Sequence, residues 1–170
     1  SQTGTFTYTN RLGTEAQSLI DDATWYTGGI PYSNTITLAD AYAAERGTQG
    51  KLCSSGTYCN DEVERTYTWT GKVGLIYPSD YGYASRNSNC ATNIRNNSNC
   101  DTNWMSGYGW SISPAPFSSN AINAWYLYTS YVDYNRAIYT HAVRPSVYLK
   151  SSVKIAGGSG TSGSPYYFSL

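Results

Sequence analysis

The spacing of apolar positions predicts two helices in the first third of the chain. The first begins at Thr14, where Thr14 and Gln17 form a capping box, and continues until Gly28 and Gly29 stop it. Its apolar positions recur at helical intervals, namely Leu12, Ala16, Leu19, Ile20 and Ala23. A strand of alternating threonines, residues 3–9, is expected before it.

The second predicted helix covers residues 38–46. Thr37 precedes it as the N-cap and Gly47 occupies the C-terminal stop position. The helical period places Leu38, Ala41 and Tyr42 on one face, which we expect to be the buried face.

The rest of the chain alternates with the shorter period of β-strands. Residues 66–70 and 73–77 predict a hairpin that ends at Pro78, and further strands are expected over residues 124–132, 143–149 and 153–155. Pro145 has no N–H group, so its strand should lie at a sheet edge or carry a bulge. The Gly/Ser-rich segment that follows resembles a linker, but an aromatic run after it predicts that the chain folds back onto the domain: Tyr166, Tyr167 and Phe168.

Residues 85–103 contain mostly Asn, Ser, Thr and Cys without either period, which predicts a long loop. The four cysteines form two close pairs, Cys53 with Cys59 and Cys90 with Cys100, and local pairing is favoured among the three possible connectivities. A zinc site is the weaker interpretation, because tighter Cys pairs or nearby histidines would be needed. Two disulfides indicate an oxidising, extracytoplasmic compartment.

Length and charge narrow the possible functions. A chain of 170 residues fits a single domain, residues 1–170. Charged residues make up 13% of it, against roughly 25% in an average soluble domain, and the formal net charge is zero. Nucleic acids and anionic lipids need clustered cations, so neither is expected as a partner. No apolar run is long enough for membrane insertion, and a start at Ser1 without Met allows that a leader or anchor has been removed.

No motif in the sequence predicts an enzyme or a resident cofactor. His141 is the one histidine and is expected at the surface before a strand, and no serine lies in a G-x-S-x-G elbow. Phosphate-binding loops and H-E-x-x-H are absent from the sequence as well. A calcium site is a weaker alternative, with oxygen donors from Asp80, Asn99, Asp101 and Asn103. No loop in the sequence has the spacing of an EF-hand, so no metal is expected.

The most informative stretch is residues 104–141, where tyrosine and tryptophan are frequent and the only charges are Asp133 and Arg136. Tyr and Trp offer rigid contact area with a polar tip, a composition typical of antibody binding loops. Such tyrosines also occur in packed strands. We expect Trp110, Trp125 and Leu127 to pack inside, and residues 131–139 to form an exposed loop.

Several long runs resemble a family of bacterial surface domains that often follow a prepilin-type leader in Gram-positive gut bacteria. They are TWYTGG from Thr24, AERGT from Ala44, WTGKVGLIYPSDYGYAS from Trp69, AVRPSVYLKSSVKI from Ala142, and GGSGTSGSPY from Gly157. The resemblance implies an α+β, C-type-lectin-like fold of the formylglycine-generating-enzyme type. In it, two N-terminal helices pack on a mixed or antiparallel sheet with long Asn/Ser/Tyr-rich loops. The catalytic cysteines of the formylglycine enzymes have no match here, so the activity does not carry over.

That fold also houses receptor-binding proteins diversified by retroelements, and residues 113–141, just before Val143-Arg144-Pro145, resemble their variable region. We therefore expect an extracellular ligand-binding display domain, on the cell surface or a type IV-like pilus, whose partner is a protein or a glycan. The alternative is the structural head of a pilin or pseudopilin whose aromatic surface packs against other subunits. The predicted contact residues are Asn120, Asn123, Tyr128, Tyr131, Asp133, Tyr134, Arg136, Tyr139 and His141.

Overall fold

Thirteen short elements follow one another in the part of the chain that the structure, a computed structural model, describes: residues 12–31, 36–47, 67–95, 97, 100, 105, 107–115, 123–129, 131–161 and 163–170. In chain order they are α1 (Thr14–Leu19), β1 (Ala23–Tyr26), α2 (Leu38–Glu45), β2 (Thr68–Gly71), β3 (Gly74–Leu75), α3 (Pro78–Tyr83), the 3₁₀ helix η2 (Ser88–Thr92), β4 (Gly109–Pro114), β5 (Asn123–Leu127), β6 (Val132–Arg136), β7 (Pro145–Ser146), β8 (Lys154–Gly157) and β9 (Tyr167–Ser169).

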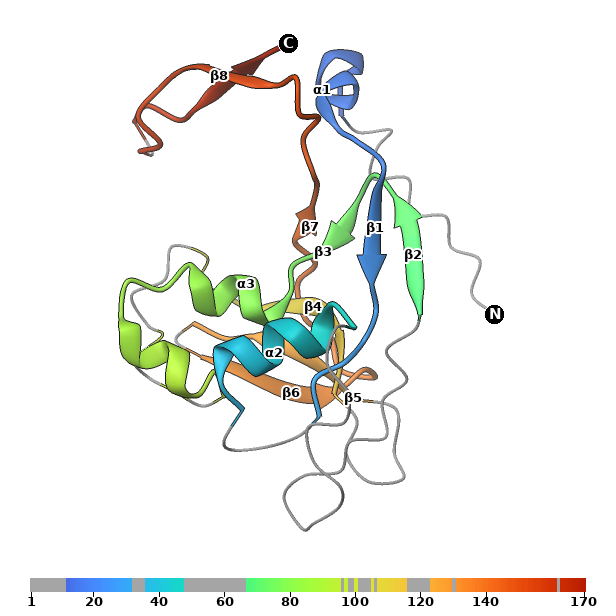
Figure 1. The fold of residues 1–170 in the computed structure, drawn as a ribbon, viewed down its shortest axis with the longest axis vertical. Coiled ribbons are helices and arrows are strands. Elements are labelled where there is room, and N and C mark those ends of the chain that lie inside the picture. Colours follow the sequence, from blue (N-terminus) through green and yellow to red (C-terminus); the bar gives the residue numbers. More distant parts are fainter. Residues whose placement is uncertain are drawn as a thin grey trace.

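The fold is α+β and is built from small antiparallel sheets with few helices, which confirms the predicted class at this level. One end of the molecule holds the three-stranded sheet β4-β5-β6, with α2 and α3 beside it (Figure 1). The pairs β1-β2 and β3-β7 lead away from this sheet toward α1 and the β8-β9 hairpin at the other end (Figure 1). Parallel pairing is limited to isolated bridges in the described residues, such as Arg95 with Val132.

The main core lies between the helices and the three-stranded sheet. Trp125 and Leu127 on β5 and Val132 on β6 are buried against α2, α3 and the segment that contains the 3₁₀ helix. The helices approach closely at Gly82, because a Cβ there would lie 2.3 Å from a methyl carbon of Leu38. Burial of Trp125 and Leu127 confirms the expectation that they pack inside.

The first predicted helix is much shorter than its apolar spacing indicates. It ends at Leu19 and buries no residue, and Gly13 is its N-cap without a side-chain hydrogen bond, so the predicted capping box with Gln17 is wrong. The chain then turns extended and forms β1, where Trp25 pairs with Trp69 of β2 and is 2% exposed. Long-range burial of the Trp25 ring outweighs the local helical period. In Figure 1, α1 lies far from the main sheet, so α2 and α3 are the helices that cover it.

The second predicted helix is confirmed as α2. Thr37 accepts a hydrogen bond from the Asp40 N–H as predicted, and Gly47 follows with a φ of 66°. The predicted buried face of this helix is wrong at one residue: Tyr42 is 45% exposed, whereas Glu45, which was not predicted to be buried, is fully buried.

The predicted hairpin of residues 66–70 and 73–77 does not form. β2 pairs with β1 instead, and β3 pairs with β7. Pro78 does not simply end a strand but begins α3, where it occupies the first helical turn, a position in which the missing N–H group costs nothing. The hairpin was predicted because the two segments are close together in the sequence. In the structure, each of these strands pairs with a strand more than 40 residues away.

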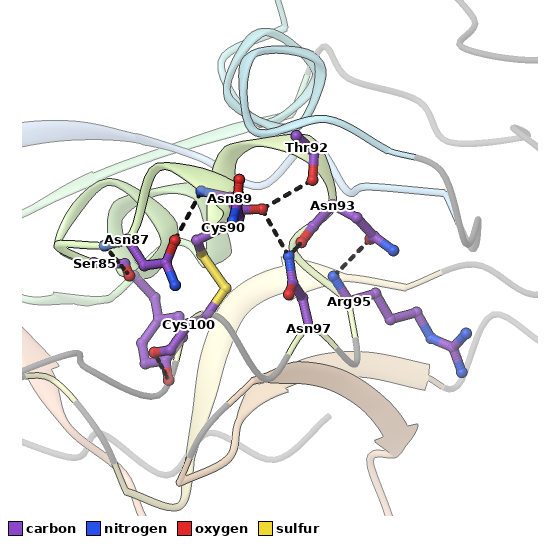
Figure 2. Close-up of a disulfide and its surroundings, with 10 residues drawn as sticks. Ser85, Asn87, Asn89, Cys90, Thr92, Asn93, Arg95, Asn97 and Cys100 are labelled. Atoms are coloured by element: carbon purple, nitrogen blue, oxygen red, sulfur yellow. Dashed lines mark hydrogen bonds between the residues drawn. A yellow bond between two sulfur atoms is a disulfide. The ribbon is translucent and has the colours of Figure 1, made fainter.

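The Asn-rich segment is irregular where the structure describes it, except for the 3₁₀ helix η2, which the prediction of a long loop did not include. Cys90 and Cys100 form the predicted disulfide, with Cα atoms 5.1 Å apart. Figure 2 shows how asparagine side chains hold the backbone of this loop: Asn97 donates to the carbonyls of Asn89 and Asn93 at 3.0 and 2.6 Å, and Asn87 accepts from the Asn89 N–H. The composition that prevents a helix therefore stabilises the turns. Cys53 and Cys59, and the strand expected over residues 3–9, lie outside the described residues.

The later strands differ in their limits from the prediction. The strand expected over residues 124–132 is a hairpin of β5 and β6, so the expected exposed loop at residues 131–139 is wrong for residues 132–136. β4 was not predicted. Pro145 lies in the two-stranded sheet β3-β7, which confirms its edge position. The tail does fold back, as β9 on β8, but its aromatic side chains Tyr166, Tyr167 and Phe168 are exposed rather than packed on the domain.

Candidate functional site

The three-stranded sheet has a second face, opposite the core. Because side chains alternate along a strand, burial of Trp125, Leu127 and Val132 on one face turns Tyr126 to the other. The register pairs Tyr126 with Trp110 of β4 and with Asp133 of β6. These three side chains form the centre of the outer face, where Tyr126 is only 8% exposed because the rings of His141 and Trp110 pack against it.

Further aromatic residues at the margins of the sheet extend this group of side chains. Tyr128 and Tyr131 close the β5-β6 turn, where the Tyr128 N–H donates to the Tyr131 carbonyl at 2.8 Å. His141 arrives on a segment that runs beside β4, since the Trp110 N–H donates to the Ala142 carbonyl at 2.9 Å. Together with Tyr108, which precedes β4, these residues form what we call the aromatic face: Tyr108, Trp110, Tyr126, Tyr128, Tyr131 and His141.

The six rings contact one another in series. His141 stacks on Tyr126 with ring centroids 4.5 Å apart, and its ring is nearly perpendicular to Trp110 at the same distance. Tyr128 meets Tyr108 edge-on at 4.3 Å and stacks on Tyr131 at 4.7 Å. Offset and edge-to-face geometries are the favourable arrangements for aromatic rings. The rings are therefore held by each other, which limits the entropy that they lose when a ligand contacts them.

The phenol groups of Tyr108, Tyr126 and Tyr131 stay protonated over the whole physiological range, because the pKa of each is raised. Desolvation, reinforced by the nearby Asp133 carboxylate, raises the pKa of Tyr126 to about 12. A hydrogen bond with Tyr128 is the main cause that raises the pKa of Tyr108 to about 12, and desolvation raises the pKa of Tyr131. Each hydroxyl can thus donate and accept hydrogen bonds.

His141 lies at the middle of the rings rather than at a free surface. Its Nε2 atom is buried and has no hydrogen-bond partner among the described residues. The expectation of a plain surface histidine is therefore wrong, because the His141 ring packs against the rings of Tyr108, Trp110 and Tyr126.

The other predicted contact residues are distributed over different places. Asp133 shares the face but pairs with Arg95, whose Nε lies 3.1 Å from its carboxylate. Tyr134 points to the opposite face and packs edge-on against Trp125, so its expected role in an exposed loop is wrong. Asn123 and Arg136 pair at the far end of β5 and β6, and Tyr139, 52% exposed, lies in the following turn. Asn120 lies outside the described residues.

Sequence reasoning missed Tyr108, Trp110 and Tyr126 as members of the site. The expectation that Trp110 packs inside holds only in part, because it is half-buried in the aromatic face. The alternation of large and small residues from Trp110 to Ser113 is a strand signal that could have placed Trp110 on one face. The pairing with Tyr126 depends on the sheet register and has no local signal.

A second polar cluster joins the two helices. Glu45 of α2 is fully buried and accepts hydrogen bonds from the Ser79 N–H at 3.1 Å and from the Ser79 hydroxyl. Arg46 lies 2.9 Å from Glu45 and 3.1 Å from Asp80, and its guanidinium covers the Tyr77 ring at 3.8 Å. Burial raises the pKa of Glu45 to about 8 despite these partners. The hydrogen bonds and ion pairs named here join residues of the cluster to one another, and they connect α2 to the start of α3.

Two further expectations concern metals and membranes. Asp80 is paired with Arg46, and the other oxygen donors considered for calcium, Asn99, Asp101 and Asn103, lie outside the described residues. Within the described part of the chain, no group of three or more His, Cys, Asp or Glu side chains could hold a metal ion. None of the helices described is both long and apolar enough to cross a membrane.

Comparison with known proteins adds no relative to this picture. The chain matches no protein-family model, and neither the curated proteins nor the solved structures contain a match to it.

Proposed function

We propose that this protein is an extracellular ligand-binding domain and that the aromatic face is its contact surface. The observation that carries the proposal is the series of six neighbouring rings on the side of the sheet opposite the core. The ligand is a protein or a glycan on another surface. Both classes present the mixed apolar and hydroxyl-rich surfaces that rigid Tyr and Trp side chains recognise.

Charge supports the same conclusion. Asp133, the carboxylate on this face, is paired with Arg95, so the surface offers aromatic area and neutral hydroxyls rather than a strong electric field. Recognition would then depend on shape and hydrogen bonds more than on electrostatic steering. The Cys90–Cys100 disulfide is compatible with a location on the cell surface or a type IV-like pilus, because disulfides persist in oxidising compartments.

Alanine substitutions at Tyr108 and Tyr131 test the contact surface. We expect each to weaken binding to an array of immobilised oligosaccharides and extracellular proteins at least about tenfold. The melting temperature should change little, because Tyr108 is 43% exposed and Tyr131 lies at the sheet margin. Tyr83→Ala is the matched control, since Tyr83 is 59% exposed on α3, away from the face. Loss of binding in the control alone, or equal binding by all variants, would contradict the proposal.

We further propose that residues 113–141 form a variable region diversified by a retroelement. The structure sharpens this idea, because Trp125 and Leu127 belong to the core and cannot vary freely. Resequencing the locus in many isolates should reveal changes at Tyr131, Arg136 and Tyr139 but not at the two core positions. An invariant stretch would instead favour a fixed pilus subunit.

A further inference from the structure

A cleft with a volume of about 300 Å³ lies beside the aromatic face, bordered by β2, β3, β4 and β7. This volume is at the lower end of the range typical of ligand pockets, so it suits one ring or one branched side chain rather than a large molecule. The side chains that line the cleft belong to these strands or to the residues just before them. They are Trp69, Val73, Leu75, Ile112, Val143 and Pro145.

The cleft adjoins the aromatic face along β4. Trp110 of that face forms a β-bridge with Val143, which lines the cleft. Burial alternates along β4, so Ile112 is partly open like Trp110, whereas the intervening Ser111 is buried. A ligand that covers the aromatic face can therefore reach the cleft with a neighbouring group.

Backbone contacts hold the walls of the cleft in place. β3 pairs with β7, and the Ile112 N–H donates to the Ile76 carbonyl at 3.1 Å, which fixes β4 beside β3. The Trp69 ring lies across Gly71, because a Cβ there would lie 2.5 Å from an indole carbon. Trp69 is still 48% exposed and forms an open wall. A cleft that is already formed costs little ordering entropy when a ligand enters.

The chemistry of the cleft favours an uncharged apolar group. Among the described residues that line it, no side chain is charged, and the indole N–H of Trp69 is the one polar side-chain group. The two cations nearby in the sequence bind elsewhere, since Lys72 donates to the Ile20 carbonyl at 3.1 Å and Arg144 donates to the Met105 carbonyl at 2.8 Å. A sugar placed in the cleft would lose hydrogen bonds between its hydroxyls and water, and the lining side chains could replace few of them.

We propose that the ligand is a protein and that it inserts one uncharged apolar side chain into this cleft while its neighbouring residues cover the aromatic face. This inference rests on the proposed binding function and selects one of its two ligand classes. Protein interfaces concentrate their binding free energy in a few side chains that fill desolvated pockets. The cleft would then supply specificity, because a charged side chain at the same position would be desolvated without a partner.

Selection of a phage-displayed library of random linear peptides on the full chain tests the proposal. We expect the selected peptides to share one uncharged apolar residue, whose replacement by alanine weakens binding at least about tenfold. Val143→Trp fills the cleft from a position that is 59% exposed, and it should weaken binding of the parent peptide by a similar factor. Val147→Trp is the matched control, since Val147 is also exposed (39%) but does not line the cleft.

Combining the two changes separates loss of the anchor contact from an indirect effect. Val143→Trp should bind the alanine-substituted peptide as well as it binds the parent, because the contact is already absent. Trp69→Ala removes one wall at another exposed position and should also weaken binding of the parent peptide.

Three results would overturn the proposal: a library without binders, selected peptides that share no apolar residue, or a parent peptide that binds Val143→Trp and Trp69→Ala as well as it binds the wild type. A chain that binds only oligosaccharides, with a loss at Tyr131→Ala, would also contradict a protein ligand. That last result would leave the proposed binding function intact, so the two proposals can fail separately.

Discussion

Replacement of Trp125 by alanine is expected to lower the free energy of unfolding by about 3–5 kcal/mol, the loss typical of a large buried aromatic ring. Trp125 is 1% exposed and packs at the centre of the core. Its indole N–H also donates to the Ile30 carbonyl at 2.8 Å, a contact that joins residues 95 positions apart. The variant would lose both the packing and this long-range connection.

Urea unfolding followed by circular dichroism measures this loss without depending on tryptophan fluorescence. Trp69→Ala is the matched control, because Trp69 is 48% exposed and should cost about 1 kcal/mol or less. Trp125→Phe keeps much of the packing and removes the hydrogen bond, so an intermediate loss is expected. Equal losses at Trp69 and Trp125 would show that the core assignment is wrong.

The second large effect concerns the pH dependence of stability at Glu45. Burial raises its pKa from 4.5 to about 8 in the folded protein. Between these values the folded chain retains a proton that the unfolded chain has released, so the free energy of unfolding must fall as pH rises. This contribution is fully present below about pH 4.5 and is lost as the pH passes about 8. Its slope approaches about 1.4 kcal/mol per pH unit.

Glu45→Gln tests this directly, because glutamine stays neutral and can still accept the hydrogen bond from the Ser79 N–H. The wild type should be at least as stable as this variant near pH 5, and the difference should shift in favour of the variant as the pH rises toward 9. Glu15→Gln, at an exposed position of α1, is the control and should follow the wild type. A wild type and a Glu45 variant with parallel pH profiles would refute the raised pKa.

Part of the candidate site could be predicted from the sequence alone. The low charge and the tyrosines drew attention to residues 104–141, and the structure brings Tyr128, Tyr131 and His141 of that stretch into the aromatic face. Tyr134 was predicted to lie with them in an exposed loop, because the residues from Tyr131 to His141 mix polar with aromatic side chains and lack a sustained period of two. Its position on β6 turns it toward Trp125 instead. A shift of one residue along a strand decides whether a side chain lies on the aromatic face or in the core.

What the sequence alone determined depends on contacts between near neighbours. The cap of α2 at Thr37, its stop at Gly47 and the Cys90–Cys100 bridge each involve residues at most about ten positions apart, and each was predicted correctly. The low charge and frequent tyrosine likewise act through composition and need no register.

Only the tertiary structure decided which strands pair and which way their side chains point. The residues expected to continue the first helix form β1 instead, because Trp25 becomes buried opposite Trp69. β3 pairs with β7 and not with β2, its expected partner. These pairings bring together residues 42 or more positions apart, and the free energy that stabilises them comes from burial that no local pattern records. Local chemistry therefore specified the caps and loops of this protein, whereas burial of distant aromatic rings specified its sheets and the face that its tyrosines share.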